Sequence, residues 1–208
     1  MEIIKQRNTD SVLPFVAYKP EKTVKPALII HLHGAGERGN GVEDLEKVLI
    51  HGLPKIANDE NLENTVLVMP QCPSDSFWVA KIESLKKFID QMIKRFDVDE
   101  KRIYLCGLSM GGFGTWYTAM AYPDLFAAVA PCCGGGMPWN AKVLKMPIWA
   151  FHGLKDTTVL PNQTIDMANA LKDWHPDFKL TLYEDVQHGS WEYAFTSELI
   201  KWFLTKSK

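Results

Sequence analysis

The stretch Gly107-Leu108-Ser109-Met110-Gly111 constrains the fold more than any other part of the chain. An apolar run, 102–106, precedes it and indicates a short buried strand, and helical character begins at Met110. Gly-x-Ser-x-Gly between a strand and a helix is typical of a sharp turn that holds the serine in a strained backbone conformation. Side chains in place of the two flanking glycines would clash there. The stretch therefore predicts a nucleophile elbow, with Ser109 Oγ raised above a sheet.

The rest of the chain alternates predicted strands and helices. Continuous apolar runs indicate buried strands, and apolar residues three or four apart indicate amphipathic helices. Pro14 places the first strand near a sheet edge, and Gly52 and Pro54 split the first helix. This alternation predicts an α/β fold, a mostly parallel central sheet with helices on both faces. The predicted strands are 12–18, 27–32, 65–69, 102–106, 127–130, 147–151 and 179–184, and the helices are 43–57, 82–96, 110–121, 160–174 and 191–204.

Length and charge limit the classes of protein and partner. A chain of 208 residues without repeats or linkers predicts a single domain, 1–208. The short segment between Pro131 and Pro147 leaves no room for a large lid. Lys and Arg number 23 against 25 Asp and Glu, without a basic cluster, so we expect no nucleic-acid partner. No apolar run reaches membrane-spanning length, so we expect no membrane partner.

The cysteines and the N-terminus bear on the compartment. Cys72, Cys106, Cys132 and Cys133 form no Cys-x-x-Cys pair, and the histidine spacing suggests no zinc site, so we expect no metal. Adjacent cysteines bridge each other only with strain, so the thiols are expected to be free, as in a reducing compartment. The segment 1–6 lacks the apolar core of a signal peptide. We therefore expect a cytoplasmic protein, and a chain whose leader had been removed would look the same.

The general base is selected by position in the sheet. In a parallel sheet, reactive groups gather at the carboxyl ends of the strands, on the edge where Ser109 lies. Of the six histidines, His188 follows the last predicted strand and should emerge on that edge. His175 precedes the same strand and belongs to the opposite edge. We therefore predict His188 as the base, with a surface histidine before Gly189 as the plainer interpretation.

The acid follows from the same rule. The segment 151–156 leaves a strand and ends on Asp156, which can reach His188 Nδ1, set its tautomer and stabilise the imidazolium. Asp185 is the rival because it is close to His188 in sequence, but it suits a turn better. The predicted triad is Ser109, Asp156 and His188.

An oxyanion hole is expected from the glycine-rich loop that follows the strand 27–32. One backbone N–H should come from this loop and one from Met110. The loop lacks the spacing of phosphate- and dinucleotide-binding loops. We expect His33 to buttress the loop, and Glu37 and Arg38 either to pair with each other or to line the pocket.

These motifs together resemble the α/β-hydrolase superfamily. More narrowly, the chain is similar to small lidless carboxylesterases of the phospholipase/carboxylesterase, dienelactone-hydrolase-like and feruloyl-esterase-like groups, which also resemble the catalytic domain of prolyl oligopeptidases. The resemblance covers the chain from about Pro14 to its end. The motifs that carry it are Leu32-His33-Gly34-Ala35-Gly36-Glu37-Arg38-Gly39, Pro70-Gln71-Cys72-Pro73 with Trp78, Gly107-Leu108-Ser109-Met110-Gly111-Gly112, the segment 151–156, and His188-Gly189-Ser190-Trp191.

Carried over residue by residue, the resemblance implies Ser109 as nucleophile, Asp156 as acid and His188 as base. It implies the amides of Ala35 and Met110 as oxyanion donors. It also implies that Gln71, Trp78 and Trp191 surround the mouth of the site as substrate contacts, although Trp78 can equally be a core residue. Dienelactone hydrolases themselves carry cysteine where this chain has Ser109, which argues against that particular activity.

The expected function is that of a serine carboxylesterase that acts through an acyl-enzyme on a small-molecule ester. Neither a metal nor an organic cofactor is needed, and both a monomer and a homodimer are compatible with the sequence. Two alternatives remain: a serine peptidase of the prolyl-oligopeptidase-like type, and a catalytically inactive binding protein on a hydrolase fold.

Overall fold

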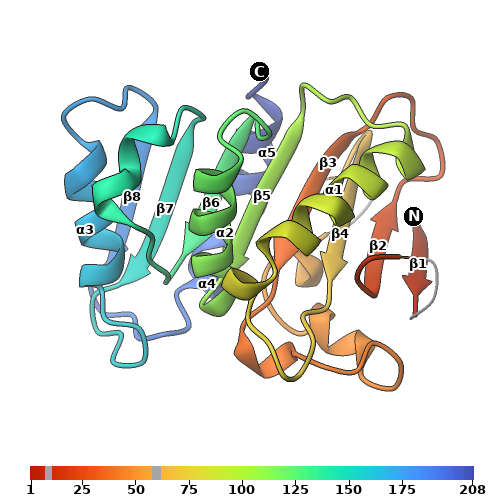
Figure 1. Cartoon of the computed structure of the whole chain (residues 1–208), viewed down its shortest axis with the longest axis horizontal. Coiled ribbons are helices and arrows are strands. Elements are labelled where there is room, and N and C mark those ends of the chain that lie inside the picture. The colour runs from red at the N-terminus through yellow and green to blue at the C-terminus, as the bar shows by residue number, and fades with distance from the viewer. Residues whose placement is uncertain (8–10, 58–61) are drawn as a thin grey trace.

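The structure, a computed structural model, describes residues 1–7, 11–57 and 62–208 and contains one eight-stranded sheet (Figure 1). The strand order is β1-β2-β4-β3-β5-β6-β7-β8. β1 and β2 are antiparallel to their neighbours, and the other pairs are parallel. The strands are β1 Glu2–Gln6, β2 Phe15–Lys19, β3 Ala27–Leu32, β4 Thr65–Pro70, β5 Ile103–Leu108, β6 Ala128–Cys132, β7 Ile148–Gly153 and β8 Phe178–Tyr183.

Helices cover both faces of this sheet, as Figure 1 shows. The α-helices are α1 Ile82–Phe96, α2 Met110–Ala121, α3 Asn162–Leu171, α4 Trp191–Ala194 and α5 Ser197–Leu204. Short 3₁₀ helices lie in the connections: η1 Ala35–Glu37, η2 Leu45–Leu49, η3 Leu53–Lys55, η4 Trp78–Ala80 and η5 Pro138–Val143. Among the described helices, none combines the length and the hydropathy that crossing a lipid bilayer requires.

The two hydrophobic cores follow from the alternation of side chains along each strand. Leu28 and Ile30 of β3 point to the face covered by α1, α2 and α3, whereas Ile29 points to the face covered by α5. β3, β4, β5 and β7 are buried along their whole length, as expected for parallel strands between two helical layers. The predicted mostly parallel sheet with helices on both faces is confirmed.

One strand was missed, and two predicted helices were wrong. Residues 2–6, for which no strand was predicted, form the edge strand β1, and β2 lies beside it, near the edge of the sheet as predicted. Residues 43–57 form η2 and η3 instead of an α-helix, and Gly52 between them has a φ of 77°. The predicted helix 191–204 is broken into α4 and α5, because Phe195 leaves the helical conformation and buries its ring against His31.

The strand ends bring the candidate site together. β3, β5, β7 and β8 run in parallel, so their carboxyl ends lie at one edge of the sheet, the lower edge in Figure 1. The segments that follow these strands carry Ala35, Ser109, Asp156 and His188. Between β6 and β7 the described chain forms only a loop and η5, so no large lid covers this edge there.

Candidate active site

Ser109 has the strained backbone that its motif predicts. It lies between β5 and α2 with φ 53° and ψ −117°, a conformation that costs free energy for a residue with a side chain. A Cβ atom on Gly107 would lie 2.3 Å from the carbonyl oxygen of Gly111, and a Cβ on Gly111 would lie 2.1 Å from that of Leu32. The glycines therefore let β5, α2 and β3 approach closely beneath the serine.

The structure brings Ser109, His188 and Asp156 into one hydrogen-bonded chain. Ser109 Oγ lies 2.9 Å from His188 Nε2, and His188 Nδ1 lies 2.7 Å from Asp156 Oδ2. An ionised carboxylate only accepts hydrogen bonds, so Nδ1 carries the proton and donates it to Asp156. Nε2 is then left as the acceptor for the hydroxyl of Ser109.

Asp156 is held in its ionised form. Burial alone would raise the pKa of this carboxyl, but the hydrogen bond from His188 and those from two backbone amides lower it. Its Oδ1 accepts the N–H groups of Thr158 and Val159, each at 2.9 Å. A second histidine, His152, also approaches Asp156, with Nε2 at 3.3 Å from Oδ2. The sequence places His152 at the end of β7, four residues before Asp156, which could have marked it as a neighbour of the site. The sequence did not show that its ring turns toward the carboxylate.

The rival residues lie elsewhere. Asp185 is exposed and pairs with Lys155, its Oδ1 lying 2.6 Å from the lysine Nζ. His175 is buried ahead of β8, and neither of its ring nitrogens has a hydrogen-bond partner in the described residues. Neither side chain contacts Ser109 or His188.

His33 buttresses the glycine-rich loop, as expected. Its Nε2 accepts the N–H of Cys72 at 2.9 Å, so Nδ1 carries the proton and donates to the carbonyl of Gly34 at 2.6 Å. Its own carbonyl accepts the indole N–H of Trp78 at 3.0 Å. Burial lowers the pKa of His33 to about 4, so the ring is neutral near pH 7.

Glu37 and Arg38 do not pair with each other. Glu37 is buried and accepts the N–H of Gly34 at 2.7 Å. Arg38 donates from Nε to the carbonyl of Ala35 at 2.9 Å and from Nη1 to that of Ser76 at 3.2 Å. Its guanidinium also lies 4.8 Å from the centre of the Phe77 ring. Of the two predicted alternatives, an ion pair or lining of the pocket, the second holds for Glu37. Arg38 instead connects the loop to the segment around Phe77.

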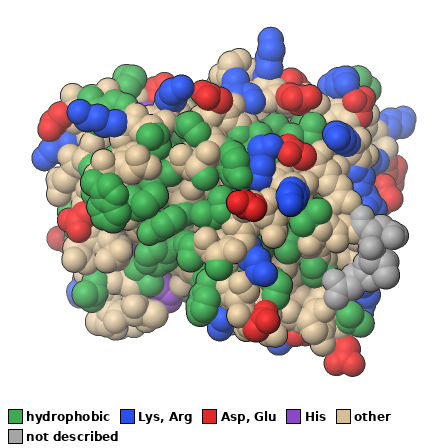
Figure 2. Space-filling view, viewed as in Figure 1, with side chains coloured by type: hydrophobic (Ala, Val, Ile, Leu, Met, Phe, Trp, Pro, Cys, Tyr) green, Lys and Arg blue, Asp and Glu red, His purple; other side chains and the backbone are tan. Residues whose placement is uncertain are grey.

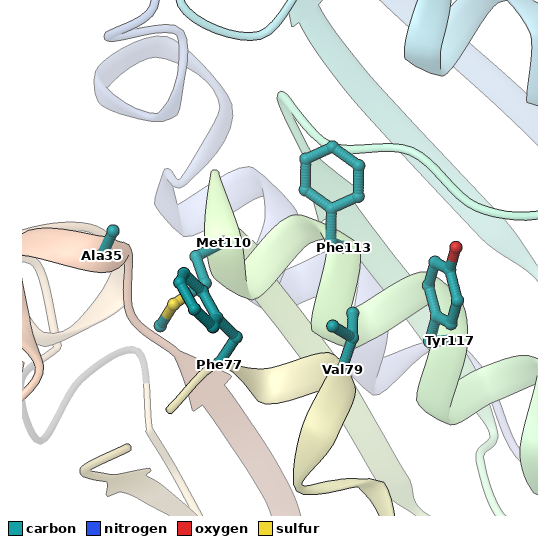
Figure 3. Close-up of a pocket in the computed structure, with 6 residues that line it drawn as sticks. All are labelled: Ala35, Phe77, Val79, Met110, Phe113 and Tyr117. Carbon is teal, nitrogen blue, oxygen red and sulfur yellow. The ribbon is translucent and has the colours of Figure 1, made fainter. Parts of the chain in front are cut away.

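Two hollows meet beside Ser109. The first, here named the serine cleft, has a volume of about 220 Å³ and is lined by Ser109 and His188 together with Glu37, His51, Thr158 and Trp191, among others. The second, here named the apolar pocket, has a volume of about 330 Å³ and is lined by Ala35, Phe77, Val79, Met110, Phe113 and Tyr117 (Figure 3). Ala35 lines both hollows.

The prediction of Gln71 as a substrate contact was wrong, and of the two interpretations of Trp78 the structure supports the core residue. Gln71 is fully buried and accepts the N–H of Gly41 at 2.9 Å, while its amide nitrogen donates to the carbonyls of Glu37 and Asp44. Trp78 is also fully buried, in the core beneath α2. Both side chains hold the loops from inside. Trp191 does line the serine cleft, with its ring 5.2 Å from that of His188, and its role as a substrate contact stays a prediction.

The sequence interpretation missed part of the apolar pocket. Phe113 and Tyr117 are four residues apart on α2, so they lie on the same face of that helix. This spacing was visible in the sequence. What the sequence could not show is that this face of α2 turns toward Val79 rather than into the core.

All four cysteines are free, as predicted, and all four are buried. Cys133 Sγ lies 3.3 Å from the backbone nitrogen of Ser109. Together with Asp156 and His188 it forms a group of potential metal ligands whose atoms lie within 4.8 Å of one another. In this structure His188 is bonded to Asp156 through Nδ1 and to Ser109 through Nε2.

Comparisons with known proteins show what the chain is similar to in sequence and fold. The dienelactone hydrolase family model matches residues 63–196. A bifunctional acetylxylan esterase/xylanase, XynS20E of Neocallimastix patriciarum, is 36% identical over 118 residues, which are 56% of this chain and 16% of that protein. The crystal structure of a thermostable esterase is 28% identical, with a TM-score of 0.81, over 100% of this chain and 62% of that one. This chain thus spans less than two thirds of either protein.

An acetyl xylan esterase from Aspergillus awamori is also similar in structure. It superimposes with a TM-score of 0.72 over 98% of this chain and 99% of its own, at 14% identity. At that identity the likeness concerns the fold alone. The predicted α/β-hydrolase fold is confirmed by these structural matches.

Proposed function

The chain belongs to the dienelactone hydrolase family, and from that premise we propose that it hydrolyses carboxylic esters. The observation that carries the proposal is the continuous chain of hydrogen bonds from Ser109 through His188 to Asp156. Ser109 is the proposed nucleophile, His188 the general base and Asp156 the acid that orients it. An alcohol hydroxyl is a weak nucleophile until an adjacent base removes its proton, and this geometry supplies the base.

The proposed reaction has two halves. Ser109 Oγ attacks the ester carbonyl while His188 Nε2 takes its proton, and the amides of Ala35 and Met110 stabilise the oxyanion. His188 then returns the proton to the departing alcohol oxygen, which leaves an acyl group on Ser109. In the second half His188 activates a water molecule that attacks the acyl-enzyme, and the acid is released as Ser109 regains its proton.

The alcohol part of the substrate is proposed to be polar. The serine cleft, on the side of His188, is lined by Glu37, His51 and Thr158, groups able to bond hydroxyls, and by Trp191. The acetylxylan esterase named above acts on a carbohydrate ester, and we extend that class of alcohol to this chain. The esterase names of the relatives favour ester over peptide hydrolysis.

The proposed setting is that of an enzyme for small esters, a monomer or a homodimer, that binds neither nucleic acid nor a membrane. All four cysteines are free thiols. Free thiols are typical of reducing compartments, which supports a cytoplasmic location.

The test is the replacement Ser109→Ala. We expect kcat for p-nitrophenyl butyrate to fall by about 10⁴-fold or more, because the nucleophile is lost. Labelling by a fluorophosphonate probe should disappear, while the circular dichroism spectrum and the melting temperature stay close to those of the parent. Ser207→Ala, at an exposed serine near the C-terminus, is the control. Retention of most of the activity in the Ser109 variant would remove the assignment.

A further inference from the structure

The apolar pocket has no role in the mechanism proposed above. Figure 3 shows Phe113 and Tyr117 projecting from α2 and facing Phe77 and Val79 of the η4 segment, with Met110 near Phe77. Its volume of about 330 Å³ is within the range of small-molecule sites. Phe77 is 52% exposed and Val79 41% exposed, and apolar side chains gather over this face of the molecule (Figure 2). An apolar ligand group would cover surface that is otherwise left in water.

The pocket is joined to the reacting centre on a defined side. It shares Ala35 with the serine cleft, and it is also lined by Met110, so both proposed oxyanion donors stand at its entrance. His188 lines the serine cleft and not the apolar pocket. The two hollows therefore meet at Ala35, and the serine cleft holds Ser109 and His188 while the apolar pocket lies on the side of Met110.

The reaction then decides which part of the ester enters which hollow. The departing oxygen must lie within hydrogen-bonding distance of His188 Nε2, because that nitrogen delivers its proton. The alcohol part is thereby directed into the serine cleft. The acyl part leaves the carbonyl carbon on the other side, and the apolar pocket is the hollow that begins there.

Arg38 stabilises the wall of this pocket. One of its nitrogens holds the carbonyl of Ala35, another holds that of Ser76, and the guanidinium stacks on the ring of Phe77. Phe77 is thus kept in place although half of its surface is exposed. The wall is fixed to the same loop that carries an oxyanion donor.

We infer that the apolar pocket is the acyl subsite and that the preferred acyl group is apolar and larger than acetyl, either an aryl group or an unbranched chain. The inference rests on the proposed ester hydrolysis and adds which part of the ester is selected. An acetyl methyl group would leave Phe113 and Tyr117 uncovered. A longer acyl group would contact both, and its binding energy would be available in the transition state.

The experiment measures acyl preference, the ratio of kcat/KM for p-nitrophenyl hexanoate to that for p-nitrophenyl acetate. Val79→Trp fills the pocket, and we expect it to lower the ratio by about tenfold or more, the scale on which apolar pockets discriminate. Phe77→Ala, which removes one wall, should lower the ratio as well. Val24→Trp is the matched control: Val24 is 82% exposed and precedes β3, at the opposite edge of the sheet, so the ratio should not change.

A second series keeps the acetyl group and varies the alcohol. Val79→Trp should leave the order of preference among these alcohols as it is in the parent protein. If the Val79 variant still reacts with fluorophosphonate at Ser109, an unchanged acyl ratio would overturn the assignment of the apolar pocket as the acyl subsite. A change in alcohol preference in place of acyl preference would overturn it as well. If the parent protein neither hydrolysed these esters nor reacted with the probe, the proposed function itself would fail, and the subsite with it.

Discussion

Glu37 is a buried carboxylate in a position that bears on catalysis without touching the reacting atoms. Its Oε2 accepts the N–H of Gly34 at 2.7 Å, and its Oε1 lies 4.0 Å from His51 Nε2. The first bond sets the turn between β3 and η1, and so the direction of the next amide, that of Ala35. Glu37 is therefore a positioning residue for the proposed oxyanion hole.

Replacing Glu37 should separate positioning from charge. We expect Glu37→Ala to lower kcat by about 10- to 100-fold with little change in KM, because loss of one aligned oxyanion donor weakens the transition state rather than substrate binding. Glu37→Gln keeps an oxygen acceptor for Gly34 and should recover most of kcat. Steady-state kinetics with p-nitrophenyl butyrate measures both. An alanine variant that folds and keeps the parent kcat would contradict the role.

At this scale the sequence was informative where a residue follows a strand. Ser109 was predicted from its Gly-x-Ser-x-Gly motif, and Asp156 and His188 were selected because a parallel sheet brings the carboxyl ends of its strands together. Gln71 was misjudged and Trp78 was left open, because a loop of glycines, prolines and polar residues has no periodicity to show which side chains face inward. Only the bonds of Gln71 to three separate backbone groups reveal that it is internal.

The elbow depends on the close packing of the first turn of α2 against the end of β3. Gly111, in the first turn of α2, lies against the backbone of Leu32 and His33 at the end of β3. The atoms that a side chain would meet belong to the main chain of a buried strand, which cannot rotate away. This contact fixes the height of Ser109 relative to the loop that carries Ala35.

Gly111→Ala should accordingly destabilise the protein by about 2 to 3 kcal/mol, the usual cost of forcing extra atoms into a packed interior. Gly36→Ala is the comparison, since a Cβ there would meet nothing within 4 Å, and its effect should stay below about 1 kcal/mol. Urea unfolding measures both free energies. Equal stability of the two variants would show that α2 and the end of β3 can move apart to accommodate the extra atoms.

Helices and strands were predictable where one face is plainly apolar. The ranges 82–96 and 110–121 agree with α1 and α2, because apolar spacing and the proline at 123 define their ends. β1 was missed because three of its five residues are exposed and three are polar, so it resembles a polar N-terminal segment. The break at Phe195 depends on a tertiary contact with His31, which no local pattern encodes.

Across the whole molecule, four of the six histidines are buried in neutral form: His31, His33, His152 and His175. Burial lowers the pKa of His31 to about 3 and that of His33 to about 4, and burial also lowers the pKa of His152 and His175. Unfolded chains take up these protons near pH 6.5, whereas the folded protein resists them until lower pH. The contribution of the neutral histidines to the free energy of unfolding is therefore fully present above about pH 6.5. It is lost as the pH falls toward the pKa values that these histidines have in the folded protein.

We expect the free energy of unfolding to decrease between pH 7 and pH 4.5, a window that lies above most carboxyl titrations. A tenfold difference in proton affinity between the folded and unfolded protein corresponds to about 1.4 kcal/mol, so His33 alone can contribute up to about 3 kcal/mol once its titration is complete. His33→Gln, which cannot take up the proton, should show a shallower slope. Urea unfolding at several pH values gives the slopes. A parent protein with constant stability over this window would argue against neutral burial.

The order of the strands has a consequence for a chain still being synthesised. Ser109 and His188 are 79 residues apart, and His188 and Asp156 are 32 apart, each at the end of a different strand. During translation the serine leaves the ribosome long before its base, and β8 must dock before the histidine can reach it. A hydroxyl without a neighbouring base is almost unreactive. Under the proposed mechanism, nascent and truncated chains therefore lack hydrolase activity, and reactivity is delayed until β8 has docked at the edge of the sheet.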